Sequence, residues 1–428
     1  MTEPTPSTLP ENWAPRFFTI WTGQAFSLFG SQLVQFALIW WLTQQTGSAT
    51  VLAIATFVGL LPQVLLGPFA GTFVDRTNRR LVMIVADSAI ALATLVLILL
   101  FWSGQVQVWQ VYLILLLRSA GGAFQSPAMS ASTSLMVPQQ HLTRVAGANQ
   151  ALSGIMNVVA PPVGALLIGL VPMQQVLLVD IVTAALAVLP LLFIPIPQPP
   201  HPAGASRNQP ATSFLDDFRA GLRYVMSWPG LLAILIMATL INFILTPAGS
   251  LLPLLVTKHF GLGALQLGWV ESAFGAGFIA GGLLLSAWGG FRRRIATTLL
   301  GISGLGVGTL LVGLAPANLF VLALVGMLLT GLMNPIANGP LFAVLQSSVR
   351  PEMQGRVFSL INSLATAMAL LSLLVAGPIS DGLGIRVWYW TGGSLCILMG
   401  LAGFFIPVVM NVESNRSDAG PAVQPAIE

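Results

Sequence analysis

Residues 76–102 read RTNRRLVMIVADSAIALATLVLILLFW, a cluster of three arginines followed by 22 residues with a single charge, Asp87. A helix needs about 20 mostly apolar residues to cross the hydrocarbon core of a bilayer, where lipid offers backbone N–H and C=O groups no partner. Similar runs recur along a chain of 428 residues that is 55% hydrophobic and only 7% charged. The sequence therefore predicts an all-α membrane protein.

Twelve apolar runs predict 12 transmembrane helices, because the runs are continuous and lack the alternation of barrel strands. They cover, in chain order, Phe17–Leu42, Val51–Phe73, Leu81–Trp102, Val108–Gln125, Val145–Leu170, Gln174–Ile194, Leu231–Val256, Leu267–Trp288, Ile295–Leu314, Leu319–Leu341, Val357–Ser380 and Arg386–Val409.

Positive charge is distributed unequally between the two sides of these runs. Of the 17 Lys and Arg residues, 14 fall on the side of the N-terminus, Lys258 and Arg386 fall on the other side, and Arg118 lies within a run. Cytoplasmic segments of membrane proteins carry the excess of Lys and Arg, so we expect both termini in the cytoplasm.

The longest polar interval, residues 195–229, opens with prolines and ends in an amphipathic stretch. It predicts a cytoplasmic linker with a surface helix. The linker separates a six-helix bundle at 17–194 from a second one at 230–410. We expect a cytoplasmic N-terminal tail at 1–16 and a disordered cytoplasmic tail at 411–428.

The two halves also share a spaced set of residues. Three residues of the first half have a residue of the same type 213 positions later: Pro127, Pro138 and Asn149 correspond to Pro340, Pro351 and Asn362. Two parallel six-helix repeats imply a pseudo-twofold axis along the membrane normal and a substrate site between the repeats.

Ionisable residues within the runs are candidates for proton coupling: Arg118, Asp87, Asp180 and Glu271. An unpaired guanidinium is costly in lipid, so Arg118 should face a partner or an aqueous cavity. Because arginine keeps its proton, it acts either on a nearby carboxylate or in a fixed ion pair that holds the first bundle together. The carboxylates equally suit hydration or capping near the membrane surface, and for Asp381 we expect a mostly solvated helix end.

The segment Gly71–Arg80, GTFVDRTNRR, resembles the signature of the major facilitator superfamily, Gly-x-x-x-Asp-Arg-x-x-Arg-Arg/Lys, with Asn78 where Gly is usual. The resemblance implies the major facilitator fold, with 12 helices in two pseudo-twofold-related bundles. It also implies a gating motif in which the Asp faces the start of the eleventh span. The residues concerned are Gly71, which would allow close helix approach, Asp75, Arg76, Arg79 and Arg80.

Two further segments resemble motifs of this superfamily. The segment 117–122 resembles a fourth-span motif whose Arg is associated with proton coupling. Residues 160–165 and 377–382 resemble an antiporter motif, with ordinary proline kinks as the alternative. The residues of the antiporter-like motif are Pro161, Pro162, Gly164, Gly377 and Pro378.

Amide side chains in or near the runs are candidates to line a substrate cavity, because polar amides in membranes usually face protein. They are Gln24, Gln35, Asn149, Asn157, Asn242, Asn338 and Asn362.

Residues 18–27 and 42–51 resemble bacterial macrolide efflux proteins of the proton-driven drug antiporter group, and more distantly the enterobactin exporter. The resemblance implies a secondary transporter of the bacterial inner membrane, and we expect a monomer. It would export amphipathic, macrolide-like drugs by proton antiport with alternating access. A siderophore or metabolite exporter, or a membrane protein that binds a ligand without transporting it, remains an alternative.

Several classes of function are not expected. The sequence contains neither a Ser–His–Asp constellation nor a phosphate-binding loop, which argues against an enzyme and against ATP hydrolysis. The single Cys396 and three scattered histidines provide no metal site. We expect no cofactor, metal or nucleic acid, and the partners would be a small amphipathic substrate, protons and the lipid bilayer.

Overall fold

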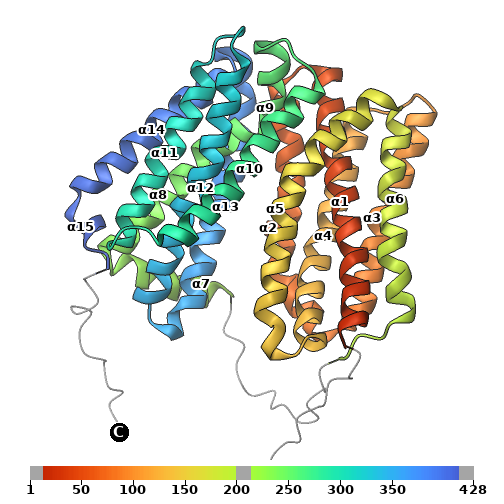
Figure 1. The fold of residues 1–428 in the computed structure, drawn as a ribbon, viewed down its shortest axis with the longest axis horizontal. Helices are drawn as coiled ribbons and strands as arrows, with labels where there is room; N and C mark the ends of the chain where they lie inside the picture. Colours follow the sequence, from red (N-terminus) through yellow and green to blue (C-terminus); the bar gives the residue numbers. More distant parts are fainter. Residues whose placement is uncertain (1–12, 199–213, 414–428) are drawn as a thin grey trace, which may run out of the picture. The chain divides into compact units, whose positions relative to one another are not determined.

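The computed structural model describes residues 13–198 and 214–413, which form helices joined by short turns (Figure 1). The helices are α1 (Trp13–Thr46), α2 (Ala49–Arg76), α3 (Arg79–Trp102), α4 (Val108–Met136), α5 (Gln139–Leu170), α6 (Met173–Phe193), α7 (Phe214–Met226), α8 (Pro229–Ser250), α9 (Leu252–Leu254), the π-helix η1 (Leu255–His259), α10 (Ala264–Trp288), α11 (Arg294–Leu314), α12 (Phe320–Ser348), α13 (Pro351–Leu383), α14 (Arg386–Phe405) and α15 (Pro407–Met410). Most of the expected tails and part of the linker (1–12, 199–213 and 414–428) lie outside the described residues.

Eleven helices of the described part are long and apolar enough to cross a membrane. The sequence predicts twelve, and the exception is α4, which forms 29 helical residues but carries Arg118 and several Gln and Ser side chains. Large apolar side chains such as Leu170 and Phe193 are 78% and 79% exposed. Lipid, rather than water, is the solvent that stabilises such a surface.

The helices divide into two units. Of the described residues, the first unit comprises 13–198, Ser250–Ser272 and Leu373–Leu383, and the second comprises 214–249, Ala273–Ser372 and 384–413. The boundary therefore falls within α10 and within α13, whose terminal segments belong to the first unit.

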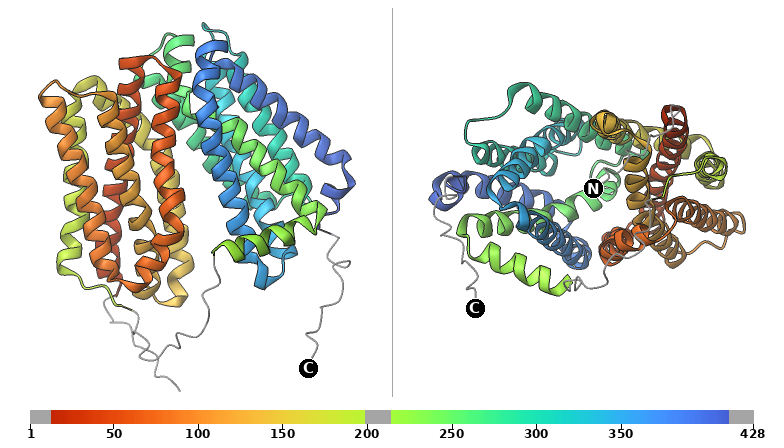
Figure 2. Two further views of the ribbon diagram at one scale, coloured as in Figure 1. Left: turned by 180° about the vertical axis from the view of Figure 1, so that it is seen from behind. Right: turned by 90° about the horizontal axis from the view of Figure 1, so that it is seen from below.

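In the first unit, α1 to α6 run side by side as long helices (Figures 1 and 2). Helix α1 packs against α5 and α6, while α3 packs against α4 and α6. Short turns separate them: Ser48 caps α2 by accepting a hydrogen bond from the Val51 N–H at 3.4 Å, and Gly47 adopts a φ of 58° just before it.

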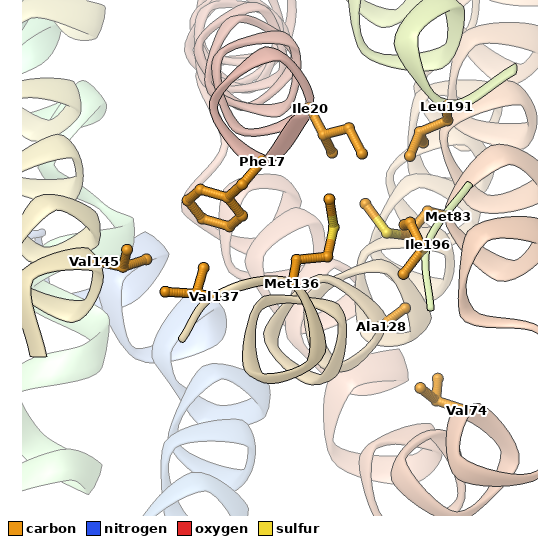
Figure 3. Packing of buried hydrophobic residues seen from close by; sticks show 10 residues of the cluster. All are labelled: Phe17, Ile20, Val74, Met83, Ala128, Met136, Val137, Val145, Leu191 and Ile196. Atoms are coloured by element: carbon orange, nitrogen blue, oxygen red, sulfur yellow. The ribbon is translucent and has the colours of Figure 1, made fainter. Parts of the chain in front are cut away.

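A cluster of buried apolar side chains closes one end of this unit, where α1 begins. Ile20, Met83 and Met136 come from α1, α3 and α4 and point toward one another (Figure 3). Phe17 and Met83 are at most 1% exposed. The cluster fixes the rotation of these helices about their axes, and so decides which of their polar residues face inward.

In the second unit, α11 packs against α12 and α14 through glycines. A Cβ at Gly308 would lie 2.7 Å from the carbonyl oxygen of Gly326, so only glycine permits this approach. The amphipathic helix α7 lies crosswise at one end of the unit (Figure 2). Its Val225 is fully buried in a cluster with Leu231 and Val357.

Candidate functional site

Arg118 of α4 and Asp180 of α6 form an ion pair inside the first unit. Their side chains are 7% and 1% exposed. The Asp180 carboxylate also accepts hydrogen bonds from the Thr94 hydroxyl at 2.7 Å and the Ser31 hydroxyl at 3.0 Å. Four helices thus contribute to one neutral cluster, in which both charges have hydrogen-bonding partners. This is the condition under which a buried ion pair is tolerated.

Asp87 of α3 has a different environment. It is 4% exposed, and its Oδ2 accepts a hydrogen bond from Nε2 of Gln24 at 2.7 Å. Gln24 in turn accepts a hydrogen bond from Nε2 of Gln125. No ion pair reaches Asp87 within the described residues. A buried carboxylate that is hydrogen-bonded but lacks a cation is a group whose charge is costly, and protonation removes that cost.

Each of the two clusters contains one residue of α3. Asp87 and Thr94 are seven residues apart, which places them about 10 Å from each other along the helix at 1.5 Å per residue. The structure therefore brings three of the four expected proton-coupling residues, Arg118, Asp180 and Asp87, into the interior of one unit.

Glu271, the fourth candidate, lies on the part of α10 that belongs to the first unit. It is partly buried, and in the described part of the chain no hydrogen bond or ion pair joins it to another residue. The neighbouring Ser272 donates a hydrogen bond to the Val158 carbonyl at 2.7 Å, which fixes this segment against α5.

The expected gating motif binds the ends of α2 and α3 to their neighbours. Asp75, 68% exposed, pairs with Arg79 at 3.2 Å, and Arg79 also donates to the Ala131 carbonyl at 2.9 Å. Arg80 donates to the carbonyls of Leu191 and Leu192 in α6. Arg76 is exposed.

Gly71 of the same motif has open space beside it. In the described part of the chain no neighbouring atom lies within 4 Å of the position that a Cβ would occupy there. A close helix approach at Gly71 therefore stays a prediction.

The antiporter-like motifs are positions of close packing within the first unit. A Cβ at Gly164 would lie 3.1 Å from Phe36, and a Cβ at Gly377 would lie 2.5 Å from Cα of Thr50. Pro161 and Pro162 lie opposite Gly268 of α10, whose Cβ would be 2.9 Å from Cα of Pro162. Pro378 is exposed.

Asp381, one turn beyond Gly377, caps the N-terminus of α2. Its carboxylate accepts hydrogen bonds from Ala49 N–H at 3.1 Å, Thr50 N–H at 3.4 Å and the Thr50 hydroxyl at 2.7 Å. The side chain is exposed, as expected, but it has a structural partner that the sequence analysis does not foresee. A carboxylate at a helix N-terminus is stabilised by the unpaired N–H groups and the helix dipole.

The amides expected to line a cavity have different surroundings. Gln24 is 2% exposed and belongs to the Asp87 cluster, whereas Gln35 is partly buried. Asn149 accepts a hydrogen bond from the Trp21 indole at 2.6 Å. Asn157 and Asn362 are exposed.

Asn242 and Asn338 do line a cavity, which lies wholly within the second unit. It has a volume of about 70 Å³ and is bounded by α8, α11 and α12. Its other walls are mainly apolar, and include Ile302 and Ala337. Each asparagine donates its amide to a carbonyl of its own helix, Ala238 and Asn334 respectively, and keeps its carbonyl oxygen as an acceptor.

Comparison with known proteins identifies the family that has this architecture. The sequence profile of the Major Facilitator Superfamily matches residues 20–364 and, in a second match, residues 234–427. The chain belongs to the Major Facilitator Superfamily. It is therefore a multi-pass membrane transporter and not an enzyme, as the sequence predicts.

Relatives of this superfamily member include efflux proteins. Macrolide efflux protein A of Streptococcus pyogenes is 34% identical over 390 residues, which cover 91% of this chain and 95% of the relative. Multidrug efflux pump Tap of Mycobacterium tuberculosis is 26% identical over 412 residues, which cover 94% of this chain and 96% of that protein.

Solved structures of other superfamily transporters share the fold. The D-xylose-proton symporter superimposes with a TM-score of 0.66 at 13% identity, covering 90% of this chain and 96% of that one. Nucleoside transporter NupG gives a TM-score of 0.62 at 14% identity, covering 89% and 97%. The predicted all-α major facilitator fold is confirmed.

The sequence does not predict three polar residues of the Asp180 and Asp87 clusters: Ser31, Thr94 and Gln125. Gln125 is the last residue of the fourth apolar run, so the sequence predicts it at the edge of a membrane span. Its position within α4, which extends eleven residues further to Met136, shows that it lies in the body of a helix.

Proposed function

We propose that this protein exports amphipathic drug-like compounds, with macrolides as the first candidates, in exchange for protons. The substrate class is taken from the relatives, which are macrolide and multidrug efflux proteins that match almost the whole chain. The mainly apolar cavity of the second unit has a volume of about 70 Å³ and two amide oxygens, which suits one small apolar group of such a compound and not the whole molecule. We propose further that both termini are cytoplasmic and that the transporter acts as a monomer.

Asp87 is the group that we assign to the exchanged proton, and its environment is the observation on which the proposal rests. Asp180 is paired with Arg118, so its charge is compensated as long as the pair is intact. Asp87 has an amide as its partner, so the loss or gain of a proton changes the net charge of a buried site. We propose that this change biases the equilibrium between a state that buries Asp87 and a state that hydrates it.

The driving force is sufficient for efflux. A gradient of one pH unit provides about 1.4 kcal/mol per proton, and a potential of 100 mV adds about 2.3 kcal/mol for each charge that crosses the membrane. Together they support an accumulation ratio of a few hundredfold for an uncharged substrate and one proton.

The test is efflux from cells that overproduce the transporter, measured over a panel of macrolides, other amphipathic drugs and siderophores. We expect macrolide efflux that a protonophore abolishes. In proteoliposomes, a pH gradient should drive uptake by the wild type and by Glu413→Gln, a matched carboxylate-to-amide change in the second unit, but not by Asp87→Asn. Gradient-driven transport by Asp87→Asn would refute the assignment of the exchanged proton to Asp87. Transport of siderophores alone would indicate that the protein is a siderophore exporter.

A further inference from the structure

Two glutamines connect Asp87 to α4 in a directed chain of hydrogen bonds. Nε2 of Gln125 donates to Oε1 of Gln24, and Nε2 of Gln24 donates to Oδ2 of Asp87 at 2.7 Å. Gln24 and Gln125 are 2% and 8% exposed, so water competes little for these bonds. The three residues come from α1, α3 and α4 of the first unit.

The chain has a direction because an amide has a donor end and an acceptor end. Gln125 presents its NH₂ group to Gln24, so Gln24 must present its oxygen to Gln125 and its own NH₂ group to Asp87. If Gln24 turned over, two NH₂ groups would face each other and a buried donor would be left without an acceptor. Unpaired buried donors are costly, so Gln24 turns over at low cost only if Gln125 turns with it, and Gln125 thereby restrains the orientation of Gln24.

We infer that Gln125 is a positioning residue for proton binding at Asp87. Acting through Gln24, it keeps a hydrogen-bond donor against the carboxylate and thereby favours the unprotonated state. A protonated Asp87 carries an O–H group, which is stabilised most by a hydrogen-bond acceptor. Gln24 presents its amide oxygen to Asp87 only after its amide group has rotated by half a turn. The inference rests on the proposed function in one respect, namely that Asp87 takes up and releases a proton.

The other charged groups near Asp87 do not perform this role. On the helices around it, Arg118 of α4 and Asp180 of α6 pair with each other. The remaining charged residues of these helices lie near the helix ends: Arg16 on α1, Asp75 and Arg76 on α2, and Arg79 and Arg80 on α3. Within the described residues, Gln24 is the hydrogen-bond donor to Asp87.

Replacement of Gln125 by methionine keeps the length of the side chain but removes both ends of the amide. Gln24 is then free to turn and to accept a hydrogen bond from protonated Asp87. A hydrogen bond to a charged group is worth enough to shift proton binding about tenfold, so the midpoint of Asp87 protonation should rise by about one pH unit. In a Gln24→Met background, Gln125→Met should cause no additional shift, because the connecting amide is gone.

Infrared difference spectroscopy on the full-length transporter in lipid vesicles measures protonation directly, through the C=O stretch of the carboxylic acid. The band that disappears in Asp87→Asn belongs to Asp87, and its pH titration gives the midpoint. The matched control is Gln63→Met, the same substitution at an exposed position of α2. It should leave the midpoint unchanged.

The expected result is a higher midpoint in Gln125→Met that does not rise further in the double variant. An unchanged midpoint, an equal additional shift without Gln24, or the lack of any titrating band assigned to Asp87 would overturn the inference. Failure of the proposed function is a separate observation. In that case Asp87 titrates and responds to Gln125→Met, while gradient-driven transport by Asp87→Asn continues.

Discussion

Removal of Arg118 alone should destabilise the first unit more than removal of the whole ion pair. In Arg118→Met, Asp180 keeps the hydroxyls of Thr94 and Ser31 but loses its cation, at a site where its side chain is 1% exposed. Loss of one partner of a buried pair costs about 3–5 kcal/mol.

In the double variant Arg118→Met/Asp180→Leu both charges are absent. Thr94 keeps an acceptor, because its hydroxyl also bonds to the Ile90 carbonyl at 3.0 Å. Ser31 loses its partner, a loss worth about 1 kcal/mol. We therefore expect a total cost of about 1–2 kcal/mol, smaller than that of Arg118→Met alone.

The assay is reversible unfolding in mixed micelles, with helicity followed by circular dichroism and each variant compared with the wild type. Arg76→Met is the control, an exposed arginine of the same unit, and should change the free energy of unfolding by less than about 0.5 kcal/mol. A double variant as unstable as the sum of both single variants would refute the reasoning, because the two charges would then be energetically independent.

The same variants separate the two interpretations of Arg118 that the sequence leaves open. If the pair only holds the first unit together, the double variant should recover gradient-driven transport along with stability. If Arg118 acts on coupling, the double variant should be stable but unable to couple a pH gradient to efflux. Proteoliposome transport at matched protein content distinguishes these results.

Three further predictions concern the gate, the cap and the cavity. Asp75→Asn should impair export if Asp75 belongs to the gating motif. Membrane insertion should be retained, because the pair of Asp75 with Arg79 is exposed and contributes little stability. Unchanged export would exclude a gating role. Asp381→Ala removes three hydrogen bonds from the N-terminus of α2, so a cysteine introduced at Val51 should react faster with a membrane-impermeant thiol reagent added outside. An unchanged labelling rate would show that the cap does not restrain this end. Ala337→Leu adds three carbon atoms beside a cavity of about 70 Å³ and should raise the KM for export, while an unaltered KM would place the substrate elsewhere.

The fold is predictable from the sequence because lipid imposes a simple rule on composition. Continuous apolar runs mark the spans, and the segment Gly71–Arg80 identifies the superfamily. Helix α4 departs from this rule for a physical reason. Its Arg118, Gln125 and Ser132 are buried within the protein, so its mean hydropathy understates how well it fits the bilayer.

The pairing within the site is not predictable in the same way. Arg118 and Asp180 are 62 positions apart, and both stand out as buried charges, yet their pairing depends on the rotation of α4 and α6 about their axes. Gln24 illustrates the same limit. An amide in a membrane helix faces protein, but the sequence does not distinguish a solvent-lined cavity from the sealed cluster around Asp87.

The division of chemistry between the units restricts how a proton and a substrate exchange. The cavity in the second unit is lined by apolar side chains, two asparagines and a threonine, and by no carboxylate. Asp87 lies in the first unit, sealed by Gln24 and Gln125. A ligand in this cavity has no proton site to compete for, so we expect proton and drug to affect each other through a conformational change rather than by displacement. By linkage, the affinity of the wild type for the substrate should then vary with pH, although no carboxylate lines the cavity, and this variation should be absent in Asp87→Asn; an equal pH dependence in both proteins would contradict the arrangement.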